Sequence, residues 1–266
     1  MSKVPVMAAV NAADAFRREN TRRAIGPLCL VAGGAVVAAL GDLSGQNWAR
    51  TVGSSIEIAA WVMAGGALMR LAFIDEHPGD AAFQPGRQGF QWNAQEWRYA
   101  AASAVQGVAV IVALGAPAAF AIMLAGLFGG IADNAKPAAA AILIGGGLIA
   151  VVLGAFISTR LSLCRAASVS SQRFAMGWDL TKGQVWPIFA AFALLLLALF
   201  AMMLMILLPL TVLASTVGVF GDAAHSGARL SAMRTLVVGL IVAFLQTPFS
   251  VGLEAYLYRG LRSEPS

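Results

Sequence analysis

The chain has 266 residues, of which 59% are hydrophobic and 12% are charged. Soluble domains carry about 25% charged residues, so this composition excludes an ordinary water-soluble protein. The formal net charge of +5 does not indicate a nucleic-acid partner, because the cations lie beside apolar runs, where they orient a chain against anionic lipid. We therefore expect an integral membrane protein with no nucleic-acid partner.

The first 24 residues precede the first apolar run and combine arginines with one apolar helical face. The arginines are Arg17, Arg18, Arg22 and Arg23, and the apolar face is formed by Met7, Val10, Ala13, Phe16 and Ala24. This pattern predicts an amphipathic helix on the membrane surface, with its arginines toward phosphate headgroups. A cleaved signal peptide is the alternative, but acidic residues interrupt the cationic region and five more spans follow.

Six apolar runs are candidates for transmembrane helices, each of which needs roughly 20 residues. They cover residues 27–41, 52–73, 99–127, 137–158, 186–208 and 235–258. Pro209 is expected to end the fifth span, and the apolar run beyond it to Phe220 predicts an interfacial or re-entrant segment. The fold class is all-α: a polytopic bundle of six transmembrane helices with cytoplasmic interfacial amphipathic helices. We expect one domain over residues 1–266, with the N-terminal segment at 1–24, the bundle at 27–258 and a short tail at 259–266.

Lysine and arginine divide unequally between the two sides of this bundle. Fourteen lie on the side of the termini: Lys3, Arg17, Arg18, Arg22, Arg23, Arg70, Arg87, Arg98, Arg160, Arg165, Arg173, Lys182, Arg259 and Arg262. Four lie on the other side: Arg50, Lys136, Arg229 and Arg234. Cytoplasmic loops retain positive charge, so we expect both termini in the cytoplasm and a bacterial-type inner membrane. Cys29 and Cys164 then lie on the reducing side, and a structural disulfide is not expected.

Residues 159–186 carry four cations and one acid between two apolar runs. A similar but weaker pattern lies near residue 90. Both segments contain a pattern that fits a helix-capping box, at Asn93–Glu96 and at Thr181–Gln184. The spacing suggests two hairpins of one design: a span, an interfacial helix and a capped span, with spans six and one as a third, non-contiguous copy. The alternative is that any cytoplasmic loop collects Arg and Trp, because Trp suits the membrane interface. A parallel repeat of this kind weakens a transporter interpretation.

Part of this loop resembles a known family. The residues are Arg160-Leu-Ser-Leu163, Phe174, the run GWDLTKG from Gly177 to Gly183, and Trp186. They resemble the fourth loop of bacterial six-span membrane domains, including the one attached to some glycerophosphodiester phosphodiesterases, and the AYLYR run ending at Arg259 is similar too. The resemblance implies a six-span fold. The catalytic barrel is absent, so it implies no acid, base or metal-ligand role for any residue of this chain.

The candidate site residues form two groups. Lipid or partner contacts are expected at the cytoplasmic face, from Arg17, Arg18, Arg22, Arg23, Arg87, Trp92, Trp97, Arg160, Arg165, Arg173, Trp178, Lys182 and Trp186. An intramembrane polar site is expected from Glu57, Gln246, Thr247 and Glu254, because carboxylates and amides are costly in lipid unless they are paired or face water.

Each intramembrane residue has a predicted partner and a structural alternative. We expect Glu57 to pair with Gln246 or Thr247, or with Arg50 or Arg234; the alternative is a carboxylate that reaches the outer interface or caps a neighbouring backbone. We expect Glu254 to pair with Arg70 or Arg160. Gln246-Thr247-Pro248 breaks a backbone hydrogen bond in mid-membrane, which predicts a packing kink more readily than a solute site.

No metal site or cofactor is expected. His77 and His225 fall on opposite sides of the membrane, and the acidic cluster Asp75, Glu76 and Asp80 reads as a solvated turn because Pro78 and Gly79 interrupt it.

Three functions fit this pattern. The first is a non-catalytic scaffold or accessory subunit whose cytoplasmic face binds anionic lipid headgroups, a protein partner or a second copy of the chain. The second is a transporter or channel for a small solute or protons, using Glu57 and the proline-broken helices; the shortage of buried polar residues weighs against it. The third is a lipid-modifying enzyme at the interface, which needs a general base where the sequence offers only His77 and scattered carboxylates.

Overall fold

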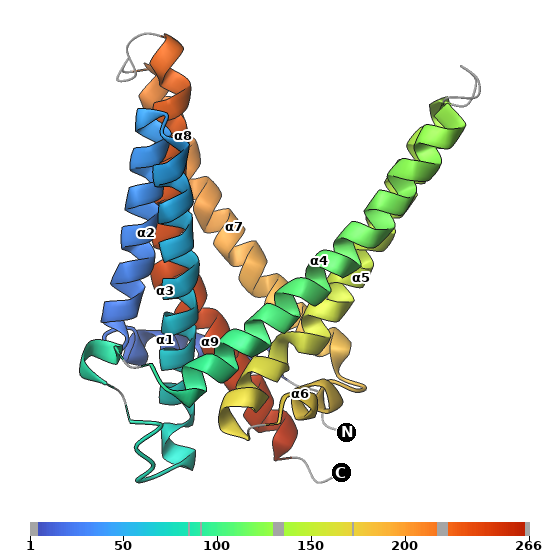
Figure 1. Ribbon diagram of the computed structural model, residues 1–266. Coiled ribbons are helices and arrows are strands. Elements are labelled where there is room, and N and C mark those ends of the chain that lie inside the picture. The colour runs from blue at the N-terminus through green and yellow to red at the C-terminus, as the bar shows by residue number, and fades with distance from the viewer. Residues whose placement is uncertain are drawn as a thin grey trace.

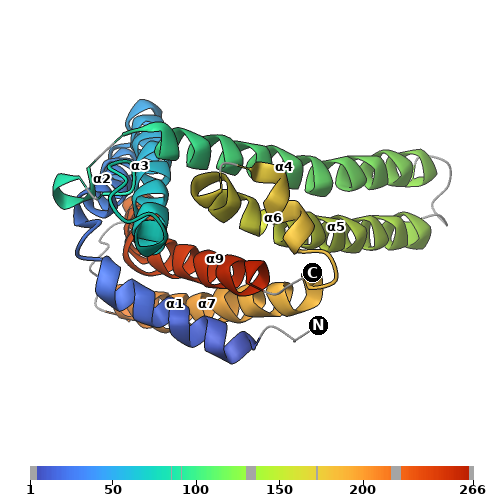
Figure 2. The same ribbon diagram turned by 90° about the horizontal axis from the view of Figure 1, so that it is seen from below.

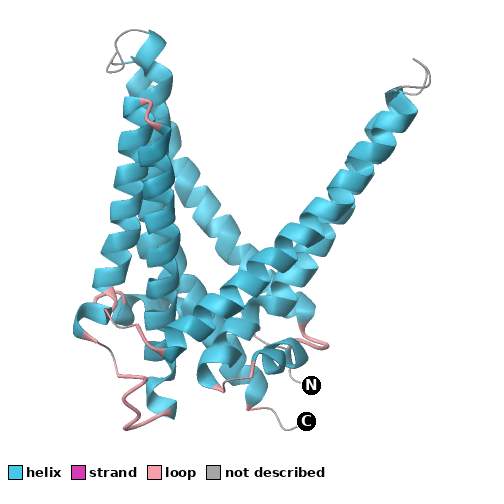
Figure 3. Cartoon of the chain, viewed as in Figure 1, coloured by secondary structure: helices cyan, strands magenta, loops and turns pink. Residues whose placement is uncertain are grey.

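A computed structural model describes residues 5–84, 86–90, 92–129, 136–171, 173–216 and 223–263. Every regular element in these ranges is helical (Figure 3). Six of the helices described there are long and apolar enough to cross a membrane, which confirms the predicted all-α polytopic bundle. The protein is therefore a multi-pass membrane protein.

The chain order places a surface helix before the first span and short helices between later ones. The elements are α1 (Val6–Asn20), α2 (Ile25–Ser44), α3 (Asn47–Phe73), η1 (Ile74–Glu76), η2 (Arg87–Gly89), α4 (Ala94–Gly129), α5 (Lys136–Ser170), α6 (Phe174–Leu180), α7 (Val185–Thr216), α8 (Ala223–Ile241), the π-helical turn η4 (Val242–Gln246) and α9 (Thr247–Arg262).

The helices form two arms that diverge from a common end (Figure 1). One arm holds α2, α3 and α8, the other is the α4–α5 hairpin, and α7 runs obliquely between them. The common end, which we call the base, holds α1, α6 and the C-terminal end of α9. Seen from below, α9 lies between α1 and α5 (Figure 2). The start of α1 and the end of α9 therefore lie at the same end of the bundle, as an even number of spans requires.

Two helices extend well beyond the predicted spans. Helix α5 continues to Ser170 rather than ending at residue 158, so its last turns enter the base. Helix α7 passes through Pro209 to Thr216, so the expected helix end at this proline is wrong. A proline removes one backbone hydrogen bond, and transmembrane helices tolerate that loss. Of the predicted interfacial segment, residues 217–220 lie outside the described residues.

Helix α1 exists as predicted, but its apolar face packs against protein. Ala9 and Ala13 are fully buried, and Phe16 lies against Gly252 of α9. Asp14 pairs with Arg17 and with Arg18, at 2.7 Å in each case. The helix therefore joins the base, and the predicted tail at 259–266 begins as the last turn of α9, which ends at Arg262.

Glycines set the close approach of α2 to α3. A Cβ atom added at Gly34 would lie 2.6 Å from the backbone nitrogen of Glu57, and one at Gly53 would clash with the backbone at Ala38. By contrast, a Cβ at Gly33 meets nothing within 4 Å. The pairing of small residues across the interface is the usual way in which transmembrane backbones come into contact.

Near Pro248 in the last span, hydrogen bonds within the same helix bridge the irregular turn, as expected of a packing kink. The backbone N–H of Thr247 donates to the carbonyl of Val242 across the π-helical turn. The Thr247 hydroxyl donates to the same oxygen at 2.7 Å. The backbone N–H of Thr247, the residue before Pro248, is therefore satisfied within the same helix.

The two predicted capping boxes have different outcomes. The Asn93 box is confirmed: the Asn93 N–H donates to Glu96 Oε2 at 2.9 Å, and the Gln95 N–H donates to Asn93 Oδ1 at 2.8 Å. The Thr181 box is wrong, because the Thr181 hydroxyl donates back to the Trp178 carbonyl at 2.8 Å. Thr181 is the C-cap of α6, so its side chain ends one helix rather than starting the next. The two loops of the predicted repeat also differ: the loop between α3 and α4 contains two 3-10 turns, whereas the loop between α5 and α7 contains the helix α6.

Candidate functional site

Two buried ion pairs hold the helices together in the base. The first joins α3 to α4: Arg70 Nε lies 2.6 Å from Glu96 Oε1, and the two side chains are 1% and 0% exposed. Arg70 Nη1 also donates to the carbonyl of Gln84 at 3.0 Å. The pair therefore fixes the loop after α3 as well as the start of α4.

The second buried pair joins α5 to α9. Arg165 Nη2 donates to Glu254 Oε1, and Arg165 Nη1 lies 3.5 Å from the Tyr99 hydroxyl. The guanidinium carbon lies 5.7 Å from the centre of the Tyr99 ring and 5.8 Å from that of Trp61. Such distances allow cation–π attraction. Arg165 is thus surrounded by one carboxylate and two aromatic rings.

These pairs correct the predicted partner of Glu254. We expected Arg70 or Arg160, but Arg70 is paired with Glu96, and the Arg160 guanidinium stacks 4.3 Å above the Trp178 ring. Arg165 takes Glu254 because α5 continues as a helix into the base, which brings its last turns alongside α9. Counting charges along the sequence does not show how α5 is rotated about its axis, and therefore could not identify Arg165 as the partner of Glu254.

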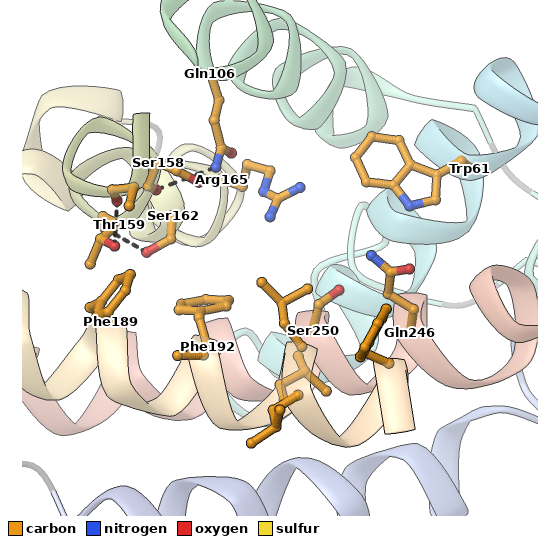
Figure 4. A pocket seen from close by; sticks show the side chains of 16 residues that line it. Trp61, Gln106, Ser158, Thr159, Ser162, Arg165, Phe189, Phe192, Gln246 and Ser250 are labelled. Carbon is orange, nitrogen blue, oxygen red and sulfur yellow. Dashed lines mark hydrogen bonds between the residues drawn. The ribbon is translucent and has the colours of Figure 1, made fainter. Parts of the chain in front are cut away.

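A cavity of about 640 Å³ lies beside Arg165. Its walls come from α3, α4, α5, α7, η4 and α9 (Figure 4). The labelled polar lining residues are Trp61, Gln106, Ser158, Thr159, Ser162, Arg165, Gln246 and Ser250, and Phe189 and Phe192 form part of the apolar wall. The volume falls within the range of small-molecule sites. Arg165 is the one charged residue among those that line it.

The cavity hydroxyls are largely satisfied by their own helix. The Thr159 hydroxyl donates to Ala155 at 2.7 Å and that of Ser162 to Thr159 at 2.8 Å. Gln106 Nε2 reaches the Ser158 carbonyl at 3.5 Å. In the described part of the chain, Arg165 Nε and Gln106 Oε1 are enclosed without a hydrogen-bond partner. Enclosed polar groups of this kind are costly, and two of them here border one cavity.

Most of the predicted surface residues lie at the base and are exposed. Arg22, Arg23, Arg173, Trp92, Trp97 and Trp186 are exposed, and Trp186 is 77% exposed. Lys182 forms an exposed pair with Asp179 at 2.7 Å. The Trp92 and Trp97 rings meet edge to face, with centroids 5.1 Å apart. Arg165 differs from this set because it is buried, and the side chain of Arg87 lies outside the described atoms.

The predicted intramembrane site does not assemble. Glu57 lies where α3 meets α2 and α8, and its Oε1 is 3.6 Å from where a Cβ at Gly239 would be. Arg50 pairs with Asp42 at 3.6 Å instead, and Thr247 bonds within its own helix. Gln246 lines the cavity, and Glu254 pairs with Arg165, which also lines it. In the described part of the chain, the four residues therefore do not form one polar site.

The acidic turn after α3 forms ion pairs with the end of α9. Glu76 Oε1 lies 2.6 Å from Arg259 Nε, and Glu76 Oε2 lies 3.4 Å from Arg262. The His77 ring stacks on Phe83 at 4.1 Å. Among the described residues, no group of three metal-binding side chains occurs. Cys29 and Cys164 are both free thiols, and the His225 side chain lies outside the described atoms.

Several cavity residues, among them Ser158 and Ser162, were missed from the sequence, although a signal for them exists. Both lie on one helical face with Arg165, which was predicted as a surface contact, because the three are spaced by four and three residues. Gln106 is a lone amide inside the third apolar run. The signal was therefore the set of polar residues on one face of a long span. We did not recognise it because the fourth span was predicted to end at residue 158, which assigned Ser162 and Arg165 to a loop.

Comparisons with protein-family models, with curated proteins and with solved structures find no match to this chain. The resemblance of residues 160–186 to the six-span membrane domains stays a prediction.

Proposed function

We propose that this chain is a non-catalytic membrane protein that binds anionic lipid headgroups at its base. The observation that carries the proposal is the exposed set of cations and tryptophans there. Arginine and lysine side chains at a membrane surface attract anionic lipid by about 1 kcal/mol each. Tryptophan rings prefer the same interface. A scaffold or accessory subunit of a larger assembly is the role that this arrangement supports best.

The proposal places the base in the cytoplasm of a bacterial-type inner membrane. Support comes from the excess of lysine and arginine in the sequence segments at that end. Reporter fusions test it: green fluorescent protein should fluoresce when fused after residue 263 or inserted at residue 182, and alkaline phosphatase should be active at residue 46. The reverse pattern would overturn the orientation.

The lipid preference is tested with protein reconstituted in vesicles of equimolar phosphatidylglycerol and phosphatidylcholine. After mild extraction, mass spectrometry measures the ratio of the two lipids retained. The Arg22→Gln/Arg23→Gln variant removes two exposed base cations, so the retained ratio should fall about tenfold or more, from about 2 kcal/mol of lost attraction.

The matched control is Arg50→Gln/Arg234→Gln, which removes two exposed arginines from the opposite end. Its retained ratio should change less than that of the base variant. Equal changes in the two variants, or equal retention of the two lipids by the wild-type protein, would contradict headgroup binding at the base.

A further inference from the structure

The cavity beside Arg165 is separate from the exposed surface of the base. Its lining residues come from the long helices α3, α4, α5 and α7 and from η4 and α9, so its walls are helices rather than loops (Figure 4). Arg165 lies five residues before the end of α5 at Ser170, or about 7.5 Å along the helix axis. Long side chains on a helix point toward its N-terminus, and in α5 this direction leads away from the base and into the cavity.

The charge of the cavity favours an anion. A guanidinium has five N–H donors, and the contacts to Glu254 and Tyr99 use two of them. Glu254 itself is not among the residues that line the cavity, so the guanidinium of Arg165, whose Nε has no hydrogen-bond partner among the described residues, is the charged group that the cavity presents. Arg165 is 9% exposed. An acceptor such as a phosphate matches the planar fork of donors that this side chain offers.

The remainder of the wall favours an acyl chain. Helix α7 contributes Phe189, Phe192, Leu196 and Phe200 to the cavity. A second, apolar recess of about 360 Å³ shares Ala155, Thr159 and Phe189 with it. The polar residues and these apolar walls together match a molecule with a charged head and a long hydrocarbon tail.

We propose that this cavity binds one acidic phospholipid from the bilayer, with its phosphate against Arg165 and an acyl chain along α7. The phosphate oxygens accept from the guanidinium, and a headgroup hydroxyl, as in phosphatidylglycerol, donates to Gln106 after a small rotation of the amide. The occupancy is one lipid per chain, held more tightly than the lipids around the base. This site does not depend on headgroup binding by the exposed arginines, and either proposal can fail alone.

Native mass spectrometry of the full chain in mild detergent tests the site. The probes are dioleoyl-phosphatidylglycerol and dioleoylglycerol, which carry the same chains with and without the phosphate. The wild-type protein should retain one phosphatidylglycerol under delipidating conditions that remove dioleoylglycerol. The Arg165→Gln/Glu254→Gln variant, which removes both charges and leaves no unpaired carboxylate, should bind the probe at least about tenfold more weakly, since hydrogen bonds to charged groups are the strong ones.

Two further variants separate binding from folding. Ser162→Leu fills the cavity and leaves the ion pair intact, and it should also lose the tight phosphatidylglycerol. Arg98→Gln is the control, because Arg98 is not among the predicted lipid contacts, bonds to Gln95 on its own helix and does not line the cavity; its retention should equal that of the wild type. Retention unchanged in Ser162→Leu, retention of dioleoylglycerol equal to that of phosphatidylglycerol, or an equal loss in Arg98→Gln would each overturn the proposal.

Discussion

The buried pair of Arg70 and Glu96 should be one of the most sensitive points of the fold. Glu96 is fully buried, and it performs two tasks: Oε1 faces Arg70 at 2.6 Å, and Oε2 accepts the N–H of Asn93 at the start of α4. Glu96→Gln keeps an acceptor for the capping bond, because glutamine also serves in a capping box. The substitution therefore removes the charge alone and leaves a buried guanidinium without its carboxylate.

Breaking a buried ion pair by removing one partner costs about 3–5 kcal/mol, and we expect Glu96→Gln to lower the free energy of unfolding by that amount. Replacing both partners with apolar residues of similar size is often nearly neutral. In Arg70→Met/Glu96→Leu, the remaining losses include the cap and the bond from Arg70 to the Gln84 carbonyl, at about 1 kcal/mol each. The double variant should thus lose about 2 kcal/mol, less than the single one.

Reversible unfolding in mixed micelles of increasing dodecyl sulfate content, followed by circular dichroism, measures these differences. The control is Lys182→Gln, which breaks an ion pair with side chains 65% and 61% exposed and should cost less than about 1 kcal/mol. If Glu96→Gln costs no more than Lys182→Gln, or if the double variant is the least stable of the three, the pair does not hold α3 to α4 as argued.

Three other outcomes follow from particular contacts. Gly34→Ala should destabilise the bundle by about 1–3 kcal/mol through overpacking, whereas Gly33→Ala, with open space around it, should be neutral or stabilising in the same micelle assay. Thr247→Val removes the hydroxyl that closes the π-helical turn, and should cost about 1 kcal/mol; no loss would show that the turn needs only its backbone bonds. The hydrogen bond from Arg17 lowers the pKa of Asp14 below its ordinary 3.8, so the stabilisation of α1 is complete above pH 3.8 and is lost as the pH falls through the lower folded-state pKa. The protection factors of the α1 amides, which correct for the intrinsic pH dependence of exchange, should fall in acid, and Asp14→Asn should remove that acid dependence.

The spans were accessible from the sequence because lipid imposes a simple rule. A segment in hydrocarbon must satisfy its backbone internally and be apolar for about 20 residues, so hydrophobic runs alone predicted six helices. The Asn93 capping box was equally local, since its bonds join residues two or three positions apart. The end of α5 was missed because the composition changes at residue 159 while the helix continues to Ser170. A helix that leaves the membrane and packs against protein need not end where its apolar run ends. The same continuity carried α7 past Pro209.

The sequence by itself determined the number of crossings, the all-α class and the end of the bundle where cations gather. Only the tertiary structure decided which cations are exposed and which are buried, that Arg165 meets Glu254, and that hydroxyls and amides from several helices border one cavity. The physical reason is that hydropathy depends on composition along the chain, whereas a partner depends on how each helix is rotated and tilted. Packing contacts between helices set those angles, and in this protein glycines such as Gly34 determine how closely two of the helices approach.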